Sequence, residues 1–337
     1  MSDPIRIGVI GAGAIVQVAH LPVLKRLKGV EVAAICDTDL AKARALADRY
    51  GIHGVFDDLE DLIRHTDVDA LLLCTPNHMH EPHILAGLSA GLHMLVEKPL
   101  AMSQVSAQKI VRAAEKRDRV VMVGMSHRYR PDAQAVRQFV QNGELGEIDS
   151  VRGSWHLARP ARAQLGWRQK MELSGGGVML DLGLTVLDLC MWLAGNPTPV
   201  RVSSSLSRAG RGEKAVDQSG SAFVLCENNC SIFVDVTWRH IGEGERFGVG
   251  LRGSKGTAGI NPLNVWKELH GTAHDVSPTG SGSRESVFNQ SFRAEWAHFL
   301  AAVGGQVPRP QLQEHVVLHQ VLDAIYESAA SGRDVTL

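Results

Sequence analysis

The sequence predicts an α/β protein of two domains: a doubly wound parallel sheet over residues 1–125, followed by an α/β domain with a mainly antiparallel sheet over residues 126–337. The first observation is an alternation of apolar runs of strand length with helical patterns, which is typical of βαβ units. The second is a change of rhythm from Ile148 onward, where strand-like runs follow one another between turn residues. A chain of 337 residues is long enough to bury two ordinary cores.

The first domain opens with an apolar run at residues 5–16, expected to be a buried strand that leads into a glycine turn. A parallel strand covered on both faces has apolar residues at successive positions. The later apolar runs of the first domain predict buried strands for the same reason. The predicted strands are residues 30–36, 70–74, 93–96 and 120–124, and the predicted helices are residues 40–50, 81–90 and 103–117.

The second domain has one apolar helix pattern after the Ser-Gly-Gly-Gly run at residues 174–177. The predicted strands are residues 200–206, 221–226, 231–238 and 247–251. Two helical patterns, at residues 288–303 and 314–331, close the chain. The last helix and the C-terminal tail are expected to pack back toward the first domain.

The glycine turn is the most informative motif. Gly11 and Gly13 allow a tight turn in which backbone N–H groups approach a pyrophosphate, and we predict that Ala14 and Ile15, which follow in the turn, also bind the cofactor. Val16 stands where the third glycine of G-x-G-x-x-G would be, so the motif alone is weak. The strand context favours a Rossmann dinucleotide site.

Asp37 follows the second predicted strand, close to the place where an acidic residue binds the adenosine ribose hydroxyls. The alternative role for Asp37 is to cap the helix that begins near Leu40, but Asp39 is better placed for that. We therefore predict that Asp37 is the ribose ligand and that NAD is preferred over NADP, because a 2′-phosphate would meet a like charge.

Composition excludes several classes of function. With 35 basic and 36 acidic residues the net charge is −1, so neither nucleic-acid nor membrane binding has electrostatic support. The longest apolar stretch, residues 177–195, is interrupted by Asp181 and Asp188, and no charged and apolar leader precedes the first strand. We expect a cytoplasmic protein with buried thiols rather than disulfides and with no metal site.

Polar motifs follow two strands of the predicted parallel sheet. Thr75, Pro76 and Asn77 come directly after one strand, and Glu97 and Lys98 come directly after the next. Ligands of open α/β sheets bind at the carboxyl ends of the strands, so both motifs are candidates for the cofactor site. A lone lysine after a strand is more often solvated than catalytic.

A polar stripe crosses the apolar helix of the second domain. Asp181, Thr185 and Asp188 share one face, because helix positions four and seven apart align. Polar groups in an apolar helix need partners, which a binding site can supply. The alternative is that Asp181 caps backbone amides.

In this order the motifs resemble the Gfo/Idh/MocA family of NAD(P)-dependent sugar and inositol oxidoreductases. The resemblance covers nearly the whole chain: the glycine turn, Thr75-Pro76-Asn77 with His80, Glu97-Lys98-Pro99, His127 to Pro131, Gly175 to Asp188, and Gly332 to Leu337. It implies a Rossmann domain followed by a large open antiparallel sheet that shapes a carbohydrate or polyol site and mediates a homodimer or homotetramer.

The resemblance implies that Lys98 is the catalytic lysine, turned toward the nicotinamide by a cis bond to Pro99, and that Asp181 and Thr185 occupy the family's Asp-x-x-x-His positions. The histidine is absent. A threonine hydroxyl can make hydrogen bonds but cannot hold the proton that an imidazole accepts. Either Lys98 works alone or through water, or His156 or His127 substitutes, or catalysis has been lost.

The family pattern also makes His80 a cofactor-pocket residue and places Trp167 and Arg168 near substrate or nicotinamide, although the aromatic could instead anchor its loop. A second pair of histidines, His315 and His319, is expected to form a solvated or subunit-facing stripe. The expected activity is hydride transfer between NAD and a secondary alcohol or ketone of a sugar, cyclitol or sugar derivative. The alternatives are an NAD-dependent glycoside hydrolase and a non-catalytic dinucleotide-binding regulator.

Overall fold

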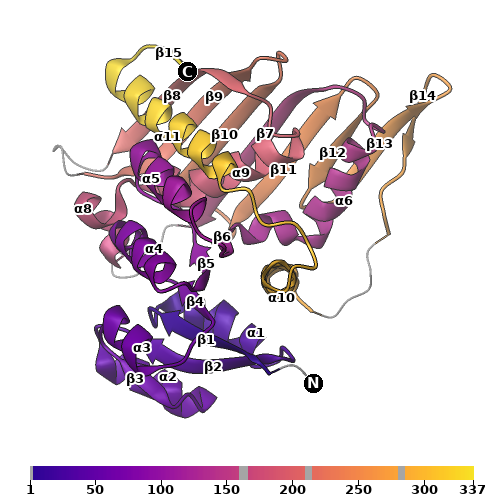
Figure 1. Ribbon diagram of the computed structural model, residues 1–337. Coiled ribbons are helices and arrows are strands. Elements are labelled where there is room, and N and C mark those ends of the chain that lie inside the picture. Colours follow the sequence, from indigo (N-terminus) through magenta and orange to yellow (C-terminus); the bar gives the residue numbers. More distant parts are fainter. Residues whose placement is uncertain (1–2, 159–165, 209–214, 280–284) are drawn as a thin grey trace. The chain divides into compact units, whose positions relative to one another are not determined.

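The computed structural model describes residues 3–158, 166–208, 215–279 and 285–337 (Figure 1). Contacts between residues divide the chain into two compact units. The first unit comprises Met1–Ala101, Val105–Ser126 and Phe288–Val316, and the second comprises Met102–Gln104, His127–Val287 and Val317–Leu337. The chain therefore crosses between the units more than once, rather than at a single boundary after residue 125.

The first unit contains a six-stranded parallel sheet in the order β3-β2-β1-β4-β5-β6. This is the strand order of a dinucleotide-binding Rossmann fold, so the predicted doubly wound parallel sheet is confirmed. The strands are β1 (Ile5–Ile10), β2 (Val30–Cys36), β3 (Gly54–Phe56), β4 (Ala70–Leu73), β5 (His93–Glu97) and β6 (Val121–Gly124).

The helices that accompany this sheet are the π-helical turn η1 (Val16–His20) with α1 (Leu21–Leu24), α2 (Leu40–Tyr50), α3 (Leu59–His65), the short 3₁₀ helix η2 (Asn77–Met79), α4 (His80–Ser89), α5 (Gln104–Ala114) and α10 (Val287–Val303). Their ends follow local chemistry. Asp39 caps α2 by accepting a hydrogen bond from the backbone N–H of Lys42 at 3.1 Å, and Gly51 ends the helix in the left-handed conformation. Because Asp39 is the cap, Asp37 is left for another role.

The second unit contains a nine-stranded sheet in the order β14-β13-β12-β11-β7-β10-β9-β8-β15. Every neighbouring pair is antiparallel except β7 and β10, which confirms the mainly antiparallel sheet. The strands are β7 (Ile148–Ala158), β8 (Pro199–Arg208), β9 (Asp217–Cys226), β10 (Ser231–His240), β11 (Arg246–Gly253), β12 (Gly256–Ile260), β13 (Asn264–Leu269), β14 (Thr272–Asp275) and β15 (Val335–Thr336).

Its helices are η3 (Ser126–Tyr129), α6 (Pro131–Gln141), η4 (Gly166–Gln169), α8 (Met171–Ser174), the π-helical turn η5 (Met179–Gly183), α9 (Leu184–Leu193) and α11 (Gln313–Ser331). Helix α9 packs closely on β7, because a Cβ atom at Gly153 would lie 2.4 Å from the side chain of Val186. Ser204 of β8 bonds to α11 through the hydroxyl of Ser328 and the carbonyl of Ile325. One face of the sheet thus carries α9 and α11.

The end of the chain belongs to the second unit, and its packing toward the first domain stays a prediction. β15 pairs with β8, so the tail extends the second sheet, and most of α11 belongs to the second unit. The segment that joins the first unit is Phe288–Val316, and its helix α10 carries the fully buried Trp296 and Phe299. Trp296 contacts the ring of His20 and that of Phe299, so α10 contributes to the core of the first unit.

Three further expectations can be compared with the structure. His315 and His319 are only 6% and 1% exposed, so the predicted solvated or subunit-facing stripe is wrong: the apolar face of α11 takes both into the interior. All five cysteines are free thiols, as expected, and all but Cys74 are buried. Among the described residues, one stretch, Met171–Leu193, is long and apolar enough to cross a membrane, and 89% of its most apolar window is buried within the protein. Such burial is typical of a core helix in a globular protein.

Candidate active site

The glycine turn lies at the carboxyl edge of the parallel sheet. Gly11 has a φ of 96°, and a Cβ atom there would come within 2.6 Å of the carbonyl oxygen of Cys74. A Cβ atom at Gly13 would meet nothing within 4 Å, so the turn is open at that point. Val16, which replaces the third glycine, is fully buried and packs as part of the core. The turn fits a pyrophosphate although the motif is incomplete.

Asp37 stands at the end of β2 beside this turn. Its carboxylate accepts hydrogen bonds from the backbone N–H of Ala12 at 2.6 Å and of Asp39 at 2.9 Å. These bonds leave acceptor capacity on a carboxylate, which offers about four lone-pair sites. Nζ of Lys42 lies 3.5 Å from the same carboxylate. The position and chemistry of Asp37 fit the two hydroxyls of an adenosine ribose.

The loop after β4 holds the second group of predicted cofactor residues, Thr75, Pro76, Asn77 and His80. His80 is 1% exposed, and its ring nitrogens lie 2.6 Å from the carbonyl oxygen of Pro99 and 2.9 Å from that of Thr75. Burial lowers the pKa of His80 more than these two carbonyls raise it. His80 therefore joins the loops that follow β4 and β5, and a direct contact of its ring with the cofactor stays a prediction.

Lys98 follows β5, and its bond to Pro99 is cis, as expected. The neighbouring Glu97 uses both carboxylate oxygens: Oε1 lies 2.9 Å from Nε2 of His20, and Oε2 accepts the backbone N–H of Lys98 at 3.2 Å. Burial raises the pKa of Glu97, while the hydrogen bond from His20 and the charge of Lys98 lower it. Glu97 is thus a carboxylate held beside Lys98.

In the second unit, Asp181 lies on the π-helical turn η5. Asp217 caps the start of this helix, because its carboxylate accepts the backbone N–H of Gly177 at 2.8 Å and of Met179 at 2.7 Å. Asp217, and not Asp181, therefore caps these backbone amides. Gly177 is required here, since a Cβ atom would come within 1.9 Å of the carbonyl oxygen of Asp217.

The structure brings four predicted substrate residues together. The guanidinium of Arg168 lies 4.6 Å from the ring centroid of Trp167, and its Nε lies 3.7 Å from the carboxylate of Asp181. Thr185 is 4% exposed, and its hydroxyl donates to the carbonyl oxygen of Asp181 at 3.5 Å. Asp181 and Arg168 keep side chains that are 20% and 40% exposed, so a ligand can reach them.

The third member of the helical stripe, Asp188, has a structural role. It is 2% exposed and receives two hydrogen bonds from the guanidinium of Arg128, at 2.7 and 2.8 Å. This paired arrangement satisfies the buried carboxylate and fixes η3 to α9. Next to Arg128, the ring of His127 lies 4.9 Å from Trp155 and 5.0 Å from Phe247. His127 is therefore part of an aromatic cluster.

His156 lies on the face of the sheet away from α9. Side chains alternate along a strand, and Gly153 of β7 faces α9, so His156 points the opposite way. There its Nε2 pairs with Asp235 at 2.7 Å, and the same carboxylate accepts the hydroxyl of Ser221 at 2.7 Å. The sheet lies between His156 and the pair Asp181 and Thr185. His156 is therefore far from the position of the missing histidine.

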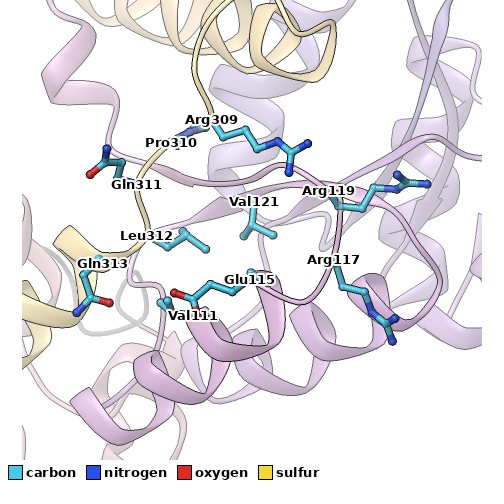
Figure 2. Close-up of a pocket in the computed structure, with 11 residues that line it drawn as sticks. Val111, Glu115, Arg117, Arg119, Val121, Arg309, Pro310, Gln311, Leu312 and Gln313 are labelled. Carbon is cyan, nitrogen blue, oxygen red and sulfur yellow. The ribbon is translucent and has the colours of Figure 1, made fainter.

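A cavity of about 320 Å³ lies in the first unit (Figure 2). Val121, the first residue of β6, contributes to it, so it opens at the amino edge of the parallel sheet, away from the glycine turn. Arg117, Arg119 and Arg309 line it, but Arg309 already pairs with Asp118. No group of three or more His, Cys, Asp or Glu side chains that could hold a metal ion occurs in the described part of the chain.

Known proteins share this architecture and much of its sequence. Residues 5–125 match an oxidoreductase family with an NAD-binding Rossmann fold, and residues 133–259 match the GFO/IDH/MocA C-terminal domain. D-glucoside 3-dehydrogenase of Escherichia coli (strain K12) is 29% identical, over 100% of this chain and 98% of that protein. Inositol 2-dehydrogenase of Corynebacterium glutamicum (strain R) is 32% identical, over 70% of this chain and 67% of that protein.

Among solved structures, GenD2 from gentamicin A biosynthesis, in complex with NAD, superposes with a TM-score of 0.85 at 25% identity, over 100% of this chain and 97% of that one. The family matches cover both the parallel sheet with its glycine turn and the antiparallel sheet that follows it. The chain is a member of the Gfo/Idh/MocA family of oxidoreductases and has that family's NAD-binding Rossmann domain.

Proposed function

We propose that this enzyme transfers hydride between NAD and a secondary alcohol or ketone of a sugar, cyclitol or sugar derivative. The observation that carries the proposal is the placement of Lys98. It follows β5 at the same sheet edge as the glycine turn after β1 and Asp37 after β2. When NAD is bound, its nicotinamide accepts or donates the hydride, and a group near it must take or give the alcohol proton.

Lys98 is the residue for that proton. Its ammonium can donate to a carbonyl oxygen during reduction, and its neutral amine can accept the hydroxyl proton during oxidation. Asp181 and Arg168, which are partly exposed and paired, suit the recognition of substrate hydroxyls. The names of the two relatives support the substrate class, because one is a dehydrogenase of a glucoside and the other of inositol. A panel of sugars and polyols, read by NADH absorbance with NAD and with NADP, tests the proposal, and no turnover of any member would contradict it.

Thr185 is expected to bind substrate rather than to move a proton. Thr185→Ala should raise KM by roughly two- to tenfold and change kcat less, because a neutral hydroxyl contributes about 0.5–1.5 kcal/mol. Steady-state kinetics on the best substrate of the panel measure both constants. Loss of turnover at unchanged KM would instead make the hydroxyl part of the proton transfer.

A homo-oligomer is expected to form through the face of the second sheet that lies opposite α9. Phe223 and Phe233 are direct neighbours across β9 and β10, and they are 36% and 39% exposed. Phe233→Glu should shift a dimer or tetramer toward the monomer in sedimentation velocity, because a buried unpaired charge opposes association. The matched control is Val105→Glu, at an exposed apolar residue of α5, which should leave the oligomer unchanged. A wild-type monomer would contradict the expectation.

We place the enzyme in the cytoplasm. All five cysteines are free thiols, which suits a reducing compartment. Fractionation of cells that express the protein tests this, and recovery outside the cytoplasmic fraction would contradict it.

A further inference from the structure

His20 is a completely enclosed ionisable side chain near Lys98. Its exposure is 0%, and its ring meets the edges of two aromatic rings of α10, with centroids 5.1 Å from Phe292 and 5.9 Å from Trp296. Both ring nitrogens have partners: Nδ1 lies 3.0 Å from Nε1 of Trp296, and Nε2 lies 2.9 Å from Oε1 of Glu97. All these groups belong to the first unit.

The partners determine which nitrogen of His20 carries the proton. An indole N–H can only donate, so Nδ1 must accept from Trp296 and carries no proton. The single proton of a neutral imidazole is then on Nε2, where it donates to the Glu97 carboxylate. Trp296 thus selects one tautomer of His20, and this tautomer is the one that Glu97 requires.

Glu295 is a second buried carboxyl group near Glu97. It is fully buried, and neither of its carboxyl oxygens has a hydrogen-bond partner in the described part of the chain. Burial and the charge of Glu97 raise the pKa of Glu295 well above its ordinary value, which favours its neutral form. The negative charge of this cluster therefore resides on Glu97, which also holds the backbone N–H of Lys98.

We propose that His20 and Trp296 are positioning residues for Lys98. The indole N–H fixes the imidazole tautomer, the imidazole fixes the Glu97 carboxylate, and the carboxylate holds the backbone at Lys98. The inference rests on the proposed role of Lys98 in proton transfer. Placement of a catalytic group matters because small displacements can cost up to about 10²-fold in rate.

The direct test is the protonation state of His20, measured without turnover. In protein labelled with ¹⁵N at histidine, the spectrum of His20→Gln identifies the signals of His20. The expected result is a ring with Nδ1 free of hydrogen and Nε2 protonated, as the partners of the two nitrogens require. A proton on Nδ1 would overturn the proposal, whatever the activity of the enzyme.

Kinetics of matched variants test the positioning role. His20→Gln can still donate to Glu97 and accept from Trp296, so it should retain most of kcat. His20→Leu can do neither and should lose roughly 10- to 100-fold in kcat, with NAD affinity changed less than about threefold. Phe292→Leu removes ring packing but no hydrogen bond and should resemble the wild type. Equal losses in the Gln and Leu variants, or no loss in the Leu variant, would overturn the proposal.

Trp296→Phe gives a signature that simple loss of packing would not produce. Without the indole N–H, Nδ1 can take a proton, so kcat should gain an inflection between about pH 5 and 8 that the wild type lacks. The double variant His20→Gln/Trp296→Phe should lose the inflection again, because the other titratable groups that face the cluster are the same in both variants. Those groups are Glu97, Lys98, Glu295, Cys74 and His80.

An inflection that persists in the double variant, or its absence from Trp296→Phe, would overturn the proposal. Failure of the proposed function would look different. If Lys98→Met kept full turnover, Lys98 would not be the proton-transfer group. The NMR measurement of the His20 tautomer does not depend on that result, so the two failures can be told apart.

Discussion

Replacing Lys98 with methionine is expected to lower kcat by roughly 10²- to 10⁴-fold, the usual effect of losing a general acid or base. NAD affinity should change by less than about threefold, because methionine keeps the length of the side chain and loses only its charge and its proton. Stopped-flow or steady-state NADH absorbance measures kcat, and titration of intrinsic fluorescence measures NAD binding.

Lys116→Met serves as the control, since it removes an exposed lysine of the same unit, and its kcat should equal that of the wild type. The order of effects is decisive. If Thr185→Ala abolished turnover while Lys98→Met was mild, a mechanism centred on the hydroxyl would replace the one proposed here.

Replacing Asp37 with serine is expected to reverse the cofactor preference. The wild type should bind NAD more tightly than NADP by roughly 10²-fold, because like charges that meet at a binding site cost several kcal/mol. Serine removes the carboxylate that repels a 2′-phosphate and leaves Lys42, now 3.5 Å from that carboxylate, available to bind the phosphate. Affinities for NAD and NADP by calorimetry give the ratio directly.

The role of Lys42 has its own control. Asp37→Ser/Lys42→Met should bind NADP more weakly than Asp37→Ser, while NAD affinity differs little between them. Equal affinity of the wild type for the two cofactors would contradict the assignment of Asp37 as the ribose ligand.

The parts of the fold that rest on local signals are predictable from the sequence. β2 and α2 have the bounds expected from their apolar and helical patterns, and Asp39 caps α2 as its position suggests. The glycine turn and Asp37 lie together because the carboxyl ends of neighbouring parallel strands meet at one edge. Short-range chemistry and the topology of βαβ units suffice for these features.

Other parts depend on contacts that no local pattern encodes. β14 is a short strand in which every residue is exposed, so it has no apolar alternation to detect. His20 and Trp296 are 276 positions apart in the chain, and no spacing rule links them. The strand that carries His156 could be expected, but which of its faces meets α9 is decided by Gly153, whose lack of a side chain admits the helix.

The central claim is that a hydride leaves a carbinol carbon of the substrate and arrives on NAD. The best alcohol from the substrate panel, deuterated at the oxidised carbon, tests it most directly when the NADH that forms is analysed by mass spectrometry. We expect one deuterium in each NADH, formed in equal amount with the ketone, and a large loss of this product with Lys98→Met. Release of aryl alcohol from aryl glycosides with no net NADH, or NADH without deuterium, would contradict it.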